Sequence, residues 1–357
     1  MRVLHLARPA AGGVLRFLQN VVPRLEQEGV ECVIACPASM HSSLSPLRTL
    51  RWEVSDRPHP LADLHCALQA KGWQKGYDLF HAHGLRTAGV LALLPPRQWL
   101  FSLHNLPPEH LAPPARWLLK RAAHSAGRIL AVSQAVRIAW LHHFPQSGEK
   151  CEVAPGGVDV DAIRPDMIDR LAARQQWNLP ESAPVALCVA RLMEDKGVDV
   201  LLRALALRPE WFALVVGEGP QRDALVRLAS ELRLEERVRF TGFLPSLDSV
   251  WSACDIAVLP SRREGLGLFA LEAMAAEKPV IVSRAGGLAE VVLPDETGWL
   301  VAPDDPVALA DGLGQAIVLR NRWRHMGEQG RKHVLRHFTW EHTAQHLLRV
   351  YRGLSSR

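Results

Sequence analysis

The sequence lacks the cysteine pairs and the long apolar runs that identify several classes of protein. Its six cysteines are scattered and include no CxxC pair, so neither a zinc site nor a disulfide framework is indicated. No run of about 18 apolar residues, the length that suggests a membrane span, occurs in the chain. The opening MRVLHLA segment has one charge and is soon followed by a glycine pair, so no signal peptide is expected. A reduced cytoplasmic protein is the resulting prediction.

Motifs for nucleic acids and dinucleotides are also missing. The chain has no zinc-finger spacing, no aromatic RNA-binding motif and no long Lys/Arg run, so a nucleic-acid partner is not expected. Gly12 and Gly13 follow the first expected strand but do not form GxGxxG, and no acidic residue closes the next strand. A nicotinamide cofactor is therefore disfavoured. The glycine pair could admit a phosphate at a helix N-terminus, or it could be a plain turn.

What the sequence does contain is the repeated strand–helix pattern of an α/β protein. A length of 357 residues suggests two domains, because single cores rarely grow beyond about 250–300 residues. Short apolar strands that alternate with helices predict doubly wound parallel sheets. In the first half we expect strands at residues 2–7, 31–37, 78–83, 99–104 and 128–133 and helices at 14–29 and 134–144. In the second half we expect strands at 185–191, 212–219, 238–242, 255–261 and 279–283 and helices at 197–207 and 221–234.

The domain boundaries follow from a break in this pattern. A segment rich in Gly, Pro and Asp at about 155–168 has the composition of a linker. We therefore predict a first Rossmann-like domain at residues 1–160 and a second at 161–338. Residues 339–357 contain an amphipathic helix that is expected to pack back on the first domain. Ligands of such sheets bind outside the carboxyl ends of the strands.

Two glutamates bracket a glycine-containing loop and the start of an apolar helix in SRREGLGLFALEAMAAEKPVIVS, residues 261–283. Glu272 falls inside the apolar run, where an unpaired carboxylate is costly. The catalytic carboxylates of glycoside hydrolases lie about 5 Å or roughly 6.5–9.5 Å apart. Eight helical residues, the separation of Glu264 from Glu272, span about 12 Å. The pair is therefore better suited to holding two ends of one polar ligand than to cleaving one bond.

Two cations follow the first strand of the second half. Arg191 lies at the carboxyl end of that strand and Lys196 precedes the next helix. At the carboxyl end of a strand, a forked guanidinium and an ammonium can hold a diphosphate. The alternative is a solvated basic loop that pairs with Glu194 and Asp195.

Histidines mark the strand ends of the first half. His81, His83 and His104 lie in HAHG and SLHN, but no further ligands are spaced for zinc, and each could be a hydrogen-bonded structural residue. His104 is the best functional candidate, because it ends a strand that faces the expected ligand site. The DVD segment at Asp159–Asp161 matches a metal-binding DxD, but Asp161 is interpreted as a helix N-cap. No metal site is predicted.

Taken together, these segments resemble the retaining glycosyltransferases of family 4, which have a GT-B fold of two Rossmann-like domains facing across a cleft. The resemblance covers nearly the whole chain and includes the E-x7-E segment. In chain order it rests on GG at 12–13, DLFHAHG, SLHN, ILAVSQAVR, APGGVD, VARLMEDKG, LVVGEGP, FTGFLP, LPSRREGLGLFALEAMA, KPVIVSRAGGLAEVV and TGWLV. The chain departs from the family pattern at Gly156, where Asn is usual, and at Asn105, where Asp is common.

The resemblance implies a role for each candidate residue. Arg191 and Lys196 would hold the diphosphate of a nucleotide-sugar, Glu272 the ribose and Glu264 the transferred sugar. Backbone N–H groups would contact phosphate and sugar, Gly12 and Gly13 would admit the β-phosphate, and His104 would lie next to the donor sugar. These backbone contacts would come from Gly267, Leu268 and Phe269.

The resemblance also implies a reaction. A hexosyl group would move from a UDP- or GDP-linked donor to an acceptor hydroxyl with retention of configuration. No metal or other cofactor would be needed, and the product would belong to cell-envelope or exopolysaccharide glycan assembly. Two other functions stay open: a sugar-nucleotide epimerase of the same architecture, and a non-catalytic binding subunit.

The uneven charge suggests where the acceptor is. Residues 1–168 carry 18 basic and 13 acidic side chains, whereas residues 169–357 carry 24 of each. Residues 86–150 alone hold eight basic and two acidic side chains, among them the helical segment PPARWLLKRAAHSAGR. An ordinary solvated helix would explain this segment. The alternative is a peripheral contact with the anionic inner face of the membrane and a lipid-linked acceptor.

Overall fold

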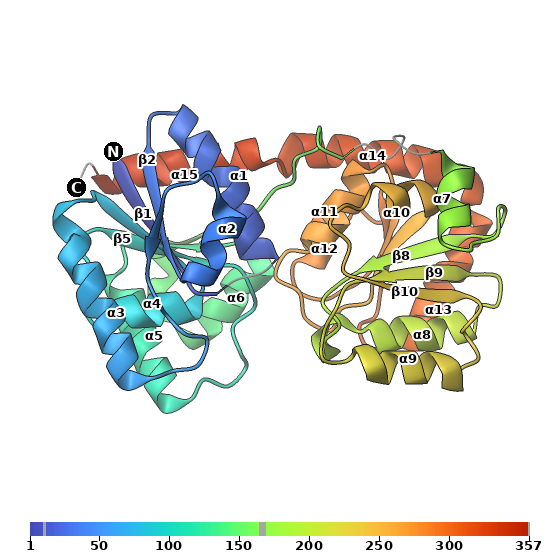
Figure 1. Ribbon diagram of the computed structural model, residues 1–357, viewed down its shortest axis with the longest axis horizontal. Helices are drawn as coiled ribbons and strands as arrows, with labels where there is room; N and C mark the ends of the chain where they lie inside the picture. The colour runs from blue at the N-terminus through green and yellow to red at the C-terminus, as the bar shows by residue number, and fades with distance from the viewer. Residues whose placement is uncertain (10–11, 164–168, 356–357) are drawn as a thin grey trace. The chain divides into compact units, whose positions relative to one another are not determined.

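The structure is a computed structural model that describes residues 1–9, 12–163 and 169–355. The chain forms two compact units. Unit 1 comprises Met1–Gly157 and Trp340–Arg357, and unit 2 comprises Val158–Thr339. The chain thus leaves unit 1 three residues before the boundary expected from sequence and returns to it one residue later than expected (Figure 1).

A parallel sheet forms the centre of unit 1, with seven strands among the described residues in the order β3-β2-β1-β4-β5-β6-β7. Its strands are β1 (Arg2–Ala7), β2 (Glu31–Cys36), β3 (Thr49–Arg51), β4 (Leu79–His83), β5 (Trp99–Leu103), β6 (Arg128–Ala131) and β7 (Cys151–Val153). Every residue of β4 and β5 is buried, as is usual for a parallel sheet covered on both faces. The chain order reverses direction between β1 and β4.

Helices pack on both faces of this sheet. They are α1 (Gly13–Gln27), α2 (His41–Leu44), α3 (Pro60–Gly72), α4 (Leu85–Leu91), α5 (Pro113–Ser125), α6 (Gln134–His143) and α15 (Trp340–Ser355), with 3-10 turns η1 (Ala38–Met40), η2 (Trp73–Lys75) and η3 (Pro145–Lys150). Helix α1 ends at Gln27, two residues before the predicted end, and Gly29 just beyond it adopts a φ of 79°, a left-handed conformation typical of helix C-termini.

Helix α15 belongs to the core of unit 1, although it follows unit 2 in the chain. It lies beside α1 (Figure 1) and buries Tyr351 completely. The Tyr351 hydroxyl lies 2.6 Å from Nδ1 of His81 on β4. Leu354 of α15 packs against Gly127, where a Cβ atom would lie 2.6 Å from the end of the leucine side chain.

Unit 2 repeats the architecture with a six-stranded parallel sheet in the described residues, ordered β10-β9-β8-β11-β12-β13. The strands are β8 (Val185–Val189), β9 (Phe212–Val216), β10 (Val238–Gly242), β11 (Ile256–Leu259), β12 (Val280–Ser283) and β13 (Gly298–Val301). The helices are α7 (Arg170–Gln176), α8 (Val198–Ala206), α9 (Arg222–Glu231), α10 (Asp248–Ala253), α11 (Leu268–Ala275), α12 (Leu288–Val291), α13 (Pro306–Val318) and α14 (Trp323–His337), with 3-10 turns η4 (Glu194–Lys196) and η5 (Arg320–Arg322).

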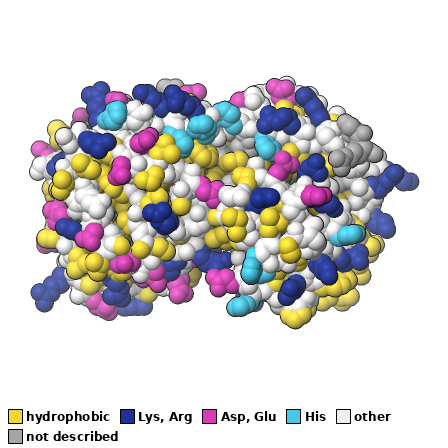
Figure 2. All heavy atoms as spheres, turned by 180° about the vertical axis from the view of Figure 1, so that it is seen from behind, with side chains coloured by type: hydrophobic (Ala, Val, Ile, Leu, Met, Phe, Trp, Pro, Cys, Tyr) yellow, Lys and Arg dark blue, Asp and Glu magenta, His cyan; other side chains and the backbone are white. Residues whose placement is uncertain are grey.

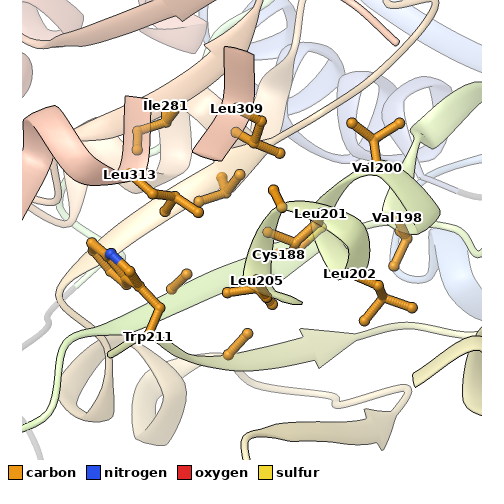
Figure 3. Packing of buried hydrophobic residues seen from close by; sticks show 14 of the residues in the cluster. Cys188, Val198, Val200, Leu201, Leu202, Leu205, Trp211, Ile281, Leu309 and Leu313 are labelled. Atoms are coloured by element: carbon orange, nitrogen blue, oxygen red, sulfur yellow. The ribbon is translucent and has the colours of Figure 1, made fainter. Parts of the chain in front are cut away.

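A hydrophobic core fixes the position of α8 on the unit 2 sheet. Leu201 and Leu205 of α8 and Leu313 of α13 are fully buried and pack over the sheet near Trp211 (Figure 3). This packing holds the end of β8 and the start of α8, and with them the two ends of the loop that joins these elements. Within the described ranges, no helix is both long and apolar enough to cross a membrane.

The predicted fold class, two tandem Rossmann-like α/β units, is confirmed. Each predicted strand is present, with ends that differ by a few residues. Three strands were missed by the sequence analysis: β3, β7 and β13. All three are edge strands of three or four residues.

Candidate active site

The strand order of unit 2 reverses direction at β8, which has β9 on one side and β11 on the other. In open parallel sheets, ligands bind outside the carboxyl ends of the strands at such a point. Arg191 and Lys196 follow β8, and Glu264 follows β11. Three of the residues singled out from sequence therefore lie at the position where the topology places a ligand site.

Lys196 and Glu264 are in direct contact. Nζ of Lys196 donates a hydrogen bond of 2.9 Å to Oε2 of Glu264, and the Ser261 hydroxyl lies 3.4 Å from the same oxygen. The Lys196 side chain is 21% exposed and that of Glu264 is 18% exposed. Each charged group therefore has an opposite charge beside it and still reaches solvent. A cation and a carboxylate side by side can bind a ligand that carries both phosphate and hydroxyl groups.

An ion-pair network that the sequence analysis missed holds the Glu264 loop. The Arg262 guanidinium donates two hydrogen bonds of 2.8 Å to the Asp199 carboxylate and also pairs with Asp304. This guanidinium holds the pKa of the Asp199 carboxyl below its usual range. The Arg262 backbone N–H donates to the Asp195 carbonyl at 2.8 Å. The loop after β11 is thus fastened to η4 and α8, which fixes Glu264 relative to Lys196.

Gly197 allows the two loops to approach each other. It has a φ of 64°, and a Cβ atom there would lie 2.0 Å from the Pro260 carbonyl oxygen. Neither the left-handed conformation nor this close approach suits another residue. Gly197 is therefore required for the start of α8 to lie against the end of β11.

Helix α11 begins at this site. Gly267 precedes it with a φ of 91°, and its carbonyl accepts the N–H of Ala270 at 2.9 Å. Leu268 and Phe269 form the first turn, whose N–H groups have no partner within a helix and favour an anion. Glu272 lies in the middle of α11 and is half-buried.

Arg191 differs from Lys196 in its surroundings. Its side chain is exposed, and its carbonyl accepts the Met193 N–H at 2.8 Å. The turn thus orders the backbone while the guanidinium extends into solvent. An exposed cation at the carboxyl end of β8 is available for a ligand.

In unit 1, the predicted histidines form a buried cluster at the carboxyl ends of neighbouring strands. His81 and His83 lie on β4, and His104 follows β5. The structure adds His5 on β1, which is in register with His81. Nδ1 of His5 lies 3.1 Å from Nε2 of His83, and Nδ1 of His83 lies 3.0 Å from Nε2 of His104. Gly12, with a φ of 77°, precedes α1 at the end of β1.

Burial keeps these imidazoles neutral. It lowers the pKa of His5 to about 3 and that of His104 to about 4. The pKa values of His81 and His83 lie well below the ordinary value, chiefly because of burial and secondarily because neighbouring histidines disfavour a second charge. At pH 7 the cluster therefore carries no charge.

The ring nitrogens of His5, His81 and His83 lie within 4.8 Å of one another, which is the only metal-compatible group found in the described residues. Both nitrogens of His81 are engaged, with Tyr351 and with Ser102 at 2.7 Å. Both nitrogens of His83 are engaged with histidines. Because these nitrogens already have hydrogen-bond partners, the arrangement favours a hydrogen-bonded network over a metal centre.

One expectation for the DVD segment is wrong. Asp161 was interpreted as a helix N-cap, but residues 160–162 form a turn. Asp159 accepts the Ala162 N–H at 3.2 Å. In this turn the Ala162 N–H reaches the carboxylate of Asp159. The sequence pattern alone could not distinguish such a turn from a helix capped by Asp161.

Comparisons with known proteins identify the family. Residues 11–162 match the model for Glycosyltransferase Family 4, and residues 169–333 match the model for Glycosyl transferases group 1. The chain is 31% identical over 370 aligned residues to the D-inositol 3-phosphate glycosyltransferase of Corynebacterium urealyticum, covering 95% of this chain and 84% of that relative.

Two further proteins extend the comparison. The GDP-mannose-dependent alpha-(1-6)-phosphatidylinositol monomannoside mannosyltransferase of Mycolicibacterium smegmatis is 34% identical over 256 residues, which are 68% of this chain and 66% of the relative. The crystal structure of Anabaena HepE in complex with UDP-glucose has a TM-score of 0.86 at 24% identity and covers 99% of this chain and 100% of that chain. At this identity it shows a shared GT-B fold. The chain therefore belongs to the family 4 glycosyltransferases.

Proposed function

We propose that the protein transfers a hexosyl group from a nucleoside-diphosphate sugar to an acceptor hydroxyl, with retention of configuration at the anomeric carbon. The observation that carries the proposal is the contact between Lys196 and Glu264 at the point where the unit 2 sheet reverses. The names of two similar proteins, one GDP-mannose-dependent and one crystallised with UDP-glucose, support a nucleotide-sugar donor. The inferred products belong to cell-envelope or exopolysaccharide glycans.

Each residue of the site has a role in this reaction. Arg191 and Lys196 bind the diphosphate, and the first N–H groups of α11, at Gly267, Leu268 and Phe269, stabilise the same negative charge. Glu272 accepts hydrogen bonds from the ribose hydroxyls, and Glu264 accepts them from the transferred sugar. His104 contacts that sugar.

The reaction needs no enzyme nucleophile. The bond from the anomeric carbon to the phosphate oxygen breaks as the acceptor oxygen forms its bond on the same face. The acceptor's proton passes to the departing phosphate oxygen. Lys196, Arg191 and the α11 N-terminus stabilise the charge that develops on the diphosphate.

Product analysis with a panel of UDP- and GDP-linked sugars tests the proposal. Free nucleoside diphosphate is expected only when an acceptor is present, in equal amount to a glycosylated product with the donor's anomeric configuration. An altered donor sugar without acceptor would identify an epimerase. Tight donor binding without turnover for every acceptor would identify a binding subunit.

Glu272 provides a prediction about donor affinity. Replacing it with glutamine keeps the shape but removes a charged acceptor, so donor affinity should fall roughly tenfold. The melting temperature should change little. Isothermal titration with the nucleoside diphosphate and thermal unfolding measure both. The control is Glu277→Gln, just beyond α11, where the side chain is 48% exposed. A large loss of stability with normal nucleotide binding would make Glu272 a structural residue.

We also propose that catalysis is independent of metal ions. Arg191 and Lys196 supply the positive charge that a divalent cation provides in other phosphate sites. Activity is therefore expected to survive excess EDTA. Complete inactivation that manganese or magnesium reverses would contradict this proposal and would make the DVD segment the candidate metal site.

The acceptor is proposed to be lipid-linked or close to a membrane, because of the surface of α3 and α5. On α3, Leu61, Leu64 and Leu68 are 77%, 43% and 54% exposed. The acid of that helix, Asp63, is buried against Arg86. Helix α5 has no acidic residue, and both helices contact α4. On the face shown in Figure 2, by contrast, acidic side chains are interspersed among the Lys and Arg side chains.

The same surface also carries basic side chains. Arg116 and Lys120 of α5 are exposed, and Trp117, which is 56% exposed, lies 5.2 Å from the Arg121 guanidinium. Exposed apolar side chains with cations, on two helices without an exposed acid, suit the interface of an anionic bilayer. Each cation there contributes about 1 kcal/mol.

Co-sedimentation with vesicles that contain anionic lipid tests this surface. Wild type should sediment at low salt and less at high salt, since the Debye length near 150 mM salt is about 8 Å. Changing Arg116, Lys120 and Arg121 together to Glu should abolish sedimentation. The control changes Arg324, Lys332 and Arg336 of α14 to Glu. Wild type that stays in the supernatant at low salt would favour a soluble acceptor.

A further inference from the structure

Three histidines form a hydrogen-bonded row in unit 1. His104 bonds through Nε2 to Nδ1 of His83, and His83 bonds through Nε2 to Nδ1 of His5. His5 and His83 are buried, and His104 is partly exposed. The row therefore connects the interior of the sheet with its carboxyl-end surface.

The row restricts the positions of the ring protons. A neutral imidazole has one N–H donor and one bare nitrogen acceptor. Since His83 uses both nitrogens for neighbouring rings, its single proton is directed either to His104 or to His5. Each choice fixes the tautomers of the two other histidines, because every bond needs one donor and one acceptor.

The surroundings of His5, at the buried end of the row, decide whether the protons are directed toward His5 or toward His104. Nε2 of His5 is buried and has no hydrogen-bond partner in the described part of the chain. If the protons were directed inward, this nitrogen would carry a buried N–H without an acceptor, which costs the desolvation penalty of that group, about 1–3 kcal/mol. If they are directed outward, His5 leaves only a bare lone pair there.

We infer that His5 and His83 are positioning residues that hold His104 as the neutral tautomer protonated on Nδ1. His104 then has an N–H, and not a bare nitrogen, at the carboxyl-end surface of the unit 1 sheet, so it can donate a hydrogen bond to a sugar oxygen there and does not act as a general base. This inference rests on the proposed function for the identity of the ligand. It agrees with a reaction in which the departing phosphate takes the acceptor's proton.

The burial of the cluster supports the same conclusion. The low pKa of His104, caused by burial, keeps the ring neutral across the physiological range. His81 lies beside the row but bonds to Tyr351 and Ser102 instead. It therefore provides a matched buried histidine on the same strand whose two ring nitrogens bond outside the row.

Nuclear magnetic resonance of ¹⁵N-histidine-labelled protein without substrate tests the tautomer directly. Long-range ¹H–¹⁵N spectra are expected to show protonated Nδ1 and bare Nε2 for His104, His83 and His5. The His104→Asn variant assigns the His104 signals. Protonated Nε2 on His104, or signals that change on chelation because a metal is bound, would overturn the inference.

Variants then test positioning. His83→Leu removes the donor and should yield mixed His104 tautomers and a kcat about tenfold lower, the rate equivalent of one hydrogen bond, with little change in the donor KM. His83→Gln, whose amide can donate, should restore most of both. His81→Gln should leave the His104 tautomer unchanged. If His83→Leu does not fold, His5→Leu provides the same tautomer test from the other end of the row.

The two proposals fail in different ways. A correct His104 tautomer without any glycosyl transfer would count against the proposed function alone. Normal transfer with an unchanged tautomer and kcat in both leucine variants would overturn the positioning role of His83 and His5.

Discussion

Acidification from pH 7 to pH 5 is expected to lower the free energy of unfolding by a large fraction. The buried His5, His81 and His83 and the partly exposed His104 stay neutral in the native state because burial lowers each pKa. In the unfolded chain each titrates near pH 6.5. At pH 5 the unfolded state therefore binds more protons, and His5, whose native pKa is about 3, alone reduces stability by about 2 kcal/mol. The other three histidines act in the same direction, against a typical total stability of about 5–15 kcal/mol.

The direction of this effect follows from the two pKa values. Well above pH 6.5 both states are neutral and stability is independent of these groups. It falls as the pH drops below 6.5 and stops falling only near the native pKa values, about 3 for His5 and about 4 for His104.

Urea unfolding at pH 7, 6 and 5 measures the effect. Replacing His5 with leucine removes one group that takes up a proton on unfolding. The slope of the free energy of unfolding against pH should therefore become shallower by about 1.4 kcal/mol per pH unit, which corresponds to one proton. His124→Gln, which changes an exposed histidine on α5, should leave the slope unaltered. Equal stability at pH 7 and pH 5 would show that the cluster is not neutral or not buried in solution.

Replacing Lys196 or Arg191 with alanine is expected to cause the largest losses of activity. Each change removes charge-assisted hydrogen bonds to the diphosphate worth about 1.5–3 kcal/mol, so kcat/KM should fall roughly 10- to 150-fold. Lys196→Ala should have the greater effect, because it also deprives Glu264 of its partner at 2.9 Å.

Steady-state kinetics with a saturating acceptor measure these losses. Lys196→Arg keeps the charge and should retain part of the activity. Arg324→Ala, at a side chain that is 92% exposed on α14, is the matched control and should behave as wild type. Unchanged kcat/KM in both the Lys196 and the Arg191 variant would rule out their assignment to the diphosphate.

Most of the fold could be predicted because central parallel strands are continuous apolar runs. β4 and β5, for example, are buried along their whole length, and their sequences reflect this. The strands β3, β7 and β13 could not be recognised in the same way. An edge strand pairs on one side only, and with three or four residues it offers too few positions for a periodic pattern.

The sequence allowed us to predict the site residues that stand out from their immediate neighbours, but not those whose role depends on contacts between distant segments. Arg191, Lys196 and Glu264 stand out because charged residues follow apolar strands. The pairing of Arg262 with Asp199 joins residues 63 positions apart. His5 alone in an apolar strand gave no signal, since its partner His83 lies 78 positions away.

The position of α15 has a consequence for synthesis on the ribosome. Its residue Tyr351 fills the interior of unit 1 and bonds to His81, yet α15 follows all of unit 2 in the chain. Domains commonly fold in the order in which they emerge. Here unit 2 has its whole sequence available first, while unit 1 waits for the helix that closes its core. A nascent chain that stops before Tyr351 would therefore leave the core of its first unit incomplete.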